Sequence, residues 1–220
     1  MVDMADDSRL WRGLLTRLAA TFPGDWQVRG SGRRVVLVKQ PVEWTLPWLG
    51  LSRTRRTDDP YLMAGVTPLV GPLIGLTSEF GLRSDEGHPR PAYFTVSLAA
   101  PEAEEQVWSF FLNDAWPLMQ HGTYEGHATC AEEQFAQPVP NRYPPWVFPD
   151  AAGWRVVLGT GSPVEPARQG IEKFRSMGDA DQDVAFYQEL IEAWEAGGQP
   201  AALAYLQQQR DATLSWLKLA

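Results

Sequence analysis

The sequence predicts an α+β fold: a mostly antiparallel sheet flanked by helices, with a C-terminal helical tail, an αα-hairpin, packed on the sheet. Apolar residues recur at helical spacing near the start of the chain and again after residue 163, which predicts helices at both ends. Between residues 26 and 99, short β-branched and aromatic runs alternate with Gly, Pro and Asp turns, a pattern typical of strands. A chain of 220 residues with 44% hydrophobic residues can bury a sizeable core.

The first helix is predicted over residues 8–22. The acids and the serine at its start suit a helix N-terminus, and Pro23-Gly24 ends it. One apolar stripe follows its length, made of Leu10, Leu14, Leu15, Leu18 and Phe22.

Six strands are predicted, over residues 26–29, 33–40, 43–54, 61–67, 73–82 and 92–99. Gly30-Ser31-Gly32 joins the first two into a hairpin. Because Val35 to Val38 form an unbroken apolar run, we expect both faces of that strand to be covered. Residues 61–78 carry no charge, but their glycines and prolines favour two buried strands over a membrane-spanning helix.

The second half of the chain predicts mainly helices, over residues 101–120, 124–135, 163–177, 181–196 and 200–218, and one short strand over 154–159. Gly197-Gly198 separates the last two helices. Residues 137–150 hold five prolines with aromatic residues between them, which predicts an extended seam. We therefore divide the chain into a sheet domain, 1–136, and the seam with its helical region, 137–220, packed together as one unit.

Charge is divided unevenly along the chain. Up to Ala100 there are 12 Lys and Arg against 10 Asp and Glu, and from Pro101 onward there are 7 against 17, which gives the net charge of −8. Residues 27–57 nevertheless hold seven basic residues and a single acid, Glu43. A local field of this kind, more than the global charge, attracts a partner.

This basic stretch is the best candidate site in the sequence. If the strand ends lie together, five guanidinium groups converge near two tryptophans; the candidate partner-binding residues are Arg33, Arg34, Arg53, Arg55, Arg56, Trp44 and Trp48. Arginine forks bind carboxylate or phosphate, and Trp and Arg dominate the energetics of protein interfaces. The alternative is that these arginines pair with the acidic C-terminal helices of the same molecule.

Catalytic motifs are sparse. His127 and Cys130 are three residues apart and His121 lies just upstream, but zinc sites use paired Cys/His elements and only one is present. The sequence has no Walker motif, nucleophile elbow or paired metalloprotease histidines. We predict no catalytic residue, no metal and no cofactor, with an enzyme site around these three residues as the open alternative.

The sequence also bears on the cellular compartment. Cys130 is the single cysteine, so the fold has no intramolecular disulfide and suits a reducing environment. The first residues are acidic and lack the apolar segment of a secretory signal. We therefore expect a cytoplasmic protein that does not bind a membrane.

The order of elements, with Val107-Trp108-Ser109-Phe110-Phe111 and Ala115-Trp116-Pro117-Leu118-Met119 in the helix after the strands, resembles small bacterial α+β domains of the immunity and accessory-protein type. The resemblance covers about half of the chain and assigns no functional residue. The missing catalytic constellation, the ten tryptophans and the charge asymmetry favour a non-enzymatic protein that binds another protein. Nucleic-acid binding through residues 27–57 is the alternative, which the net charge of −8 disfavours.

Overall fold

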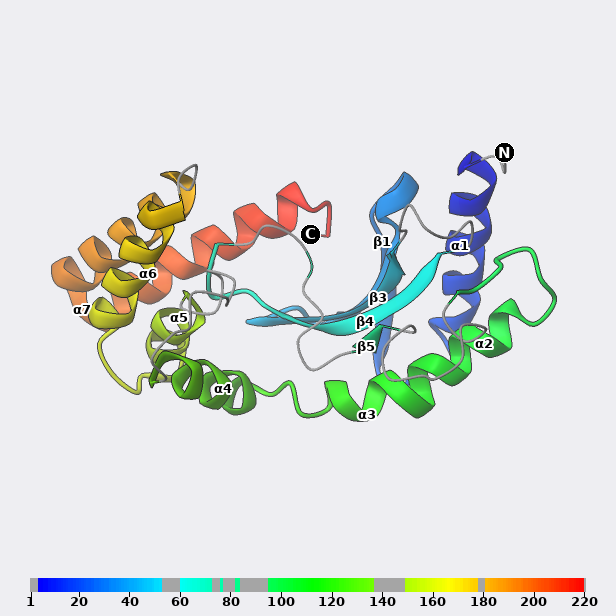
Figure 1. Cartoon of the computed structure of the whole chain (residues 1–220), viewed down its shortest axis with the longest axis horizontal. Coiled ribbons are helices and arrows are strands. Elements are labelled where there is room, and N and C mark those ends of the chain that lie inside the picture. Colours follow the sequence, from blue (N-terminus) through cyan, green and yellow to red (C-terminus); the bar gives the residue numbers. More distant parts are fainter. Residues whose placement is uncertain are drawn as a thin grey trace. The chain divides into compact units, whose positions relative to one another are not determined.

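The structure is a computed structural model of the chain that describes residues 4–52, 60–72, 76, 82–83, 95–136, 149–177 and 181–219 (Figure 1). These residues divide into two compact units. Unit 1 takes those within 1–67, 76–122 and 217–219, and unit 2 takes those within 68–75 and 123–216. The fold is α+β with an antiparallel sheet, as the sequence predicts.

Unit 1 contains the sheet, whose strands lie in the order β1-β2-β3-β4-β5. Their bounds are Asp25–Arg29, Val36–Gln40, Thr45–Ser52, Tyr61–Pro68 and Leu82–Arg83. The described pairings β1 with β2, β2 with β3, and β4 with β5 are all antiparallel. Val35, Val36, Leu37 and Val38 are all buried, so the prediction that both faces of β2 are covered is confirmed.

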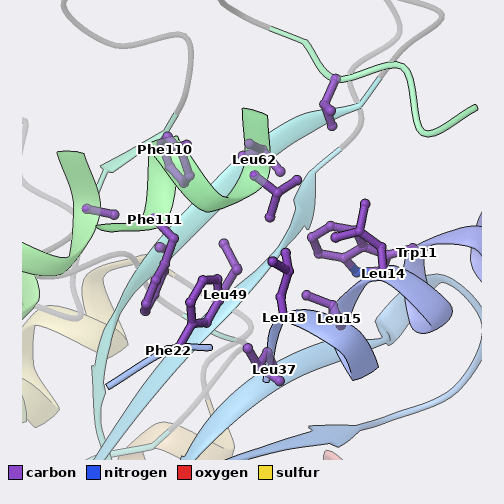
Figure 2. Close-up of a cluster of buried hydrophobic side chains, with 14 of the residues drawn as sticks. Trp11, Leu14, Leu15, Leu18, Phe22, Leu37, Leu49, Leu62, Phe110 and Phe111 are labelled. Atoms are coloured by element: carbon purple, nitrogen blue, oxygen red, sulfur yellow. The ribbon is translucent and has the colours of Figure 1, made fainter. Parts of the chain in front are cut away.

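Helix α1, Met4–Leu18, supplies one side of the core of unit 1. It starts and ends earlier than predicted, so Phe22 lies beyond the helix, but the residues of the predicted stripe are buried as expected except for Leu10, which is 36% exposed. Figure 2 shows the buried α1 side chains facing Leu37 and Leu49 of the sheet. The Trp11 indole N–H donates to the Val35 carbonyl at 2.9 Å, which satisfies the one polar atom of a side chain that is otherwise apolar.

The helix predicted over 101–120 is present but changes its winding. It consists of α2, Ala103–Ser109, a π-helical segment, Phe110–Ala115, and α3, Trp116–Met119. Pro117 has no N–H to donate within the helix. A wider turn just before it therefore costs fewer backbone hydrogen bonds than it would elsewhere in a helix. Phe110 and Phe111 in this segment are buried in the core of unit 1 (Figure 2).

Two predicted strands differ from the structure. Within 92–99, residues 92–94 lie outside the described part, and residues 95–99 form no strand, although the Val96 N–H donates to the Pro60 carbonyl at 2.9 Å. The strand predicted over 154–159 is wrong, because these residues belong mainly to helix α5, Pro149–Leu158. A short apolar run cannot be told from a buried helix by periodicity alone. Most of the seam predicted over 137–150 and most of the strand predicted over 73–82 lie outside the described residues, and residues 149 and 150 of the seam are helical, at the start of α5.

Unit 2 is helical. Its helices are α4, Tyr124–Ala136, α5, α6, Val164–Met177, and α7, Asp181–Trp216. Non-helical backbone at Gly197 and Gly198 divides α7. The Tyr205 hydroxyl donates to the Phe186 carbonyl at 3.0 Å, whereas residues this far apart in sequence would be separated by about 28 Å along a straight helix. The two halves of α7 therefore form the predicted αα-hairpin.

Burial changes the acidity of Tyr205. Removal from solvent and the nearby Glu189 carboxylate both disfavour the phenolate, so the pKa of Tyr205 is raised above its ordinary value. The hydroxyl thus stays protonated and able to donate to the Phe186 carbonyl over the physiological pH range.

In the described part of the chain, no helix has both the length and the apolar character needed to span a membrane.

Candidate functional site

The strand register gathers basic residues at one end of the sheet. Arg29, the last residue of β1, pairs with Val36, the first residue of β2. In the next pairing Leu37 lies opposite Leu49, so the start of β2 also adjoins the last residues of β3. The C-terminal ends of β1 and β3 and the N-terminal end of β2 thus lie at the same end of the sheet. In Figure 1 this is the end where the chain passes from β1 into β2. We call this the basic end of the sheet and define it by Arg12, Arg29, Arg34 and Lys218.

Glycines shape the turn that carries Arg34. Gly30 has φ +78°, and a Cβ at this position would lie 2.0 Å from the Arg34 carbonyl oxygen, so no other residue fits. The chain then forms one 3-10 turn, Gly32–Arg34, closed by the Arg34 N–H donating to the Ser31 carbonyl at 3.1 Å. A guanidinium nitrogen of Arg12 on α1 donates to the Gly30 carbonyl. Two arginines from separate elements are therefore held at the same tight turn.

A pocket of about 290 Å³ opens beside this turn. It is lined by Gly30, Ser31, Arg34, Leu217 and Lys218. Leu217 and Lys218 follow helix α7 directly, but they belong to unit 1, and Leu219 after them is 4% exposed. Lys218 has φ +58°, an uncommon left-handed conformation for a lysine. Arg34 and Lys218, which are far apart in the sequence, are thus two cationic residues that line the same pocket.

Arg29 completes the basic end from the last position of β1. It is half-buried, and one of its guanidinium nitrogens donates to the Gln27 side-chain carbonyl. Its buried Nε has no hydrogen-bond partner among the residues that the structure describes. Arg29 therefore adds a guanidinium, and its positive potential, to the basic end of the sheet.

Only part of the predicted site is found at this end. Arg34 is there and exposed, and Arg33 precedes it in the same turn, although its side chain lies outside the described part. Arg53, Arg55 and Arg56 also lie outside the described residues. The predicted convergence of five guanidinium groups therefore stays a prediction.

The two predicted tryptophans are not at the basic end. Trp44 lies just before the start of β3, about 26 Å from Ser52 along an extended strand. Trp48 is 4% exposed and donates its indole N–H to the Thr67 hydroxyl at 3.0 Å, so its choice as an anchor for a partner is corrected: it is a core residue. Among the described tryptophans the exposed ones are instead Trp108 and Trp216, at 41% and 58%.

Lys39 shows that the basic stretch is split between the two ends of the sheet. It pairs with Trp26 in the register of β1 and β2, away from the turn at Gly30. Its ammonium lies 5.1 Å from the centre of the Trp116 ring, a cation–π contact within unit 1. Counting charges along 27–57 therefore overstates how many of them act together.

The candidate enzyme residues belong to two different units. His121 is exposed in the turn after α3 and belongs to unit 1, whereas His127 and Cys130 are on α4 in unit 2. His127 is 2% exposed and stacks on Trp154 at 5.6 Å with an interplanar angle of 16°. Over the described ranges, no three His, Cys, Asp or Glu side chains are grouped so that they could hold a metal ion.

No protein-family model matches the chain, and no curated protein or solved structure matches it either. The candidate site therefore depends on the geometry of this chain alone.

Sequence reasoning missed Arg12 and Lys218, because each lies far in sequence from the stretch it joins. Helical periodicity places Arg12 on α1 and Lys218 at the end of the last helix, and only tertiary packing brings them to Gly30 and Arg34.

Proposed function

We propose that this protein is a non-enzymatic cytoplasmic interaction protein whose basic end of the sheet binds an acidic surface on a partner protein. The observation that carries the proposal is the strand register, which sets Arg29 and the turn bearing Arg34 side by side, with Arg12 and Lys218 at the same turn. The chain as a whole has a net charge of −8. A basic patch on an acidic protein selects partners by complementary charge and raises their rate of association.

The chemistry of these side chains favours a protein partner. Arginine presents a planar fork that matches a carboxylate, and a carboxylate can accept two parallel hydrogen bonds from it. Nucleic acid would place many phosphates near the rest of the surface, which the net charge of −8 repels. A folded partner brings its acidic patch to the basic end alone and avoids that repulsion.

The test is affinity capture from a nuclease-treated cell lysate, followed by measurement of the dissociation constant for the captured protein. The variant Arg34→Glu/Lys218→Glu reverses two charges at the basic end, and Arg168→Glu/Arg175→Glu reverses two exposed charges on α6 of unit 2 as the matched control. We expect the first variant to weaken binding by more than about tenfold and the second to leave it near the wild-type value. Wild-type affinity should also fall as salt is raised.

Two results would overturn the proposal. One is a partner that both double variants bind as tightly as the wild type, which would move the interface away from the basic end. The other is capture that disappears with nuclease, together with a gel shift that weakens steeply with salt, which would establish nucleic-acid binding instead.

A further inference from the structure

The pocket beside the Gly30 turn has the features of a site for a single anionic group. Its volume of about 290 Å³ lies just below the range of pockets that enclose a whole small molecule. Space of this size holds about ten waters, or a side chain that ends in a charged group. The five lining residues include two cations and no acid.

The donors around the pocket suit an oxyanion. Arg34 offers a fork for two oxygens, Lys218 a point charge with three N–H donors, and Ser31 a hydroxyl. We infer that this pocket binds a carboxylate side chain of an acidic peptide segment, and that residues Leu217–Leu219 complete the pocket by carrying Lys218 into it. This inference rests on the proposed function, since it names the group by which the partner is recognised.

The residue that follows Lys218 in the C-terminal segment is buried. Leu219 is 4% exposed, so its burial anchors the segment, whereas Lys218 next to it adopts φ +58°. Such a conformation persists in a residue other than glycine when the surroundings fix it. Because the anion binds only when Lys218 is in position, binding of the anion and docking of the segment stabilise each other.

The experiment uses the purified full chain and a fluorescein-labelled hexaglutamate peptide, with binding followed by fluorescence anisotropy at low ionic strength. Lys218→Gly is the informative variant, because glycine accepts φ +58° without strain while the ammonium group and its aliphatic stem are removed. We expect Lys218→Gly and Arg34→Gln each to weaken binding roughly tenfold, the loss of one charge-assisted hydrogen bond. Arg175→Gln removes an equal charge on unit 2 and should leave the affinity unchanged.

Leu219→Ala separates charge from docking, since it keeps both cations but removes the anchor. We expect it to weaken peptide binding as well, and we expect the peptide to slow amide hydrogen exchange at Leu217 and Lys218 in the wild type but not in Arg34→Gln. Unchanged hydrogen exchange in the wild type, or equal affinity in Leu219→Ala, would overturn the coupling.

Other outcomes would overturn the site itself. One is that the wild type, Lys218→Gly and Arg34→Gln bind hexaglutamate with equal affinity, and another is that the wild type does not bind it. A third is displacement of the peptide by an equal concentration of inorganic phosphate, which would remove the preference for carboxylate. If the peptide binds as expected but capture disappears with nuclease and the gel shift weakens steeply with salt, the proposed function fails while the pocket assignment stands.

Discussion

The two units fill the space between their elements in different ways. Unit 1 uses large rings: Phe111 stacks on Phe22 at 4.1 Å and meets the edge of Trp26 at 5.2 Å. Unit 2 also contains ring pairs, such as Phe174 and Tyr187 at 5.9 Å, but at the start of α5 it places three small buried residues, Ala151, Ala152 and Gly153. Interiors are close-packed, so a change of volume is felt in either case. We therefore expect the ring cluster around Phe111 in unit 1 to be sensitive to lost volume and the start of α5 in unit 2 to be sensitive to added volume.

The largest effect should come from adding one methyl group in unit 2, by Gly153→Ala. A Cβ on Gly153 would lie 2.1 Å from the Val70 carbonyl oxygen and 2.6 Å from the Val70 Cβ, so helix α5 or the Val70 backbone must move. We expect a loss of more than about 4 kcal/mol in the free energy of unfolding, above the usual range for overpacking because one contact is with backbone. Urea denaturation followed by circular dichroism measures this loss.

Gly170→Ala is the matched control within the same unit. The nearest atoms to a Cβ there belong to the Tyr187 ring at 3.6 Å, an ordinary contact distance. Alanine also favours the helix over glycine, so stability should stay equal or rise by up to about 1 kcal/mol. If Gly153→Ala and Gly170→Ala were equally stable, the close approach of α5 to the Val70 backbone would not limit the size of the residue at position 153.

The next effect should come from removing volume in unit 1, by Phe111→Ala. Phe111 is fully buried among Phe22, Trp26 and Trp116, and the cavity left by its ring has rigid neighbours that cannot collapse into it. We expect a loss of about 3–4 kcal/mol in the free energy of unfolding. Trp108→Ala, on the preceding helix α2, removes a larger side chain that is 41% exposed and should cost less than about 1 kcal/mol. Similar losses for both variants would refute the role assigned to the ring cluster.

The same contrast explains how far the fold could be predicted from the sequence. The α1 stripe, the hairpin around Gly30 and the break at Gly197-Gly198 follow from local rules of periodicity and turn chemistry, and all three are confirmed. The strand predicted at 154–159 was wrong because Val156, Val157 and Leu158 fit a strand by themselves. Their helical state depends on Ala151, Ala152 and Gly153, which let α5 pack closely, and that is a tertiary effect.

The candidate site was predictable only in part. A basic stretch next to a hairpin indicated Arg34, and the antiparallel register then followed from the turn. Lys218 gave no signal, because its role depends on where Leu219 docks. Trp48 was misjudged because it lies in the buried middle of β3, between the buried residues Leu46 and Leu49, so a strand tryptophan there is core.

The smallest effect should come from replacing Arg by Lys in one ion pair of each unit. In unit 2, Arg155 donates from Nε and Nη2 to the two carboxylate oxygens of Glu132 at 2.6 and 2.7 Å and from Nη1 to the Ser162 carbonyl at 3.2 Å. The hydrogen bond with Glu132 is the main reason why the pKa of Arg155 is raised above its ordinary value. In unit 1, Arg17 and Glu104 join α1 to α2 at 2.8 Å, with both side chains largely exposed.

Lysine cannot reproduce the fork that Arg155 presents to Glu132 and Ser162, so Arg155→Lys should lower the free energy of unfolding. Because the Glu132 side chain is 40% exposed and solvent screens part of the interaction, we expect a loss of about 1 kcal/mol. Arg17→Lys should change it by less than about 0.5 kcal/mol, the usual value for an exposed pair. Urea midpoints at low and high salt test both: the Arg155→Lys loss should largely persist in high salt, since it comes from hydrogen-bond geometry. Equal losses in the two variants would show that unit 2 gains nothing from a partly buried fork.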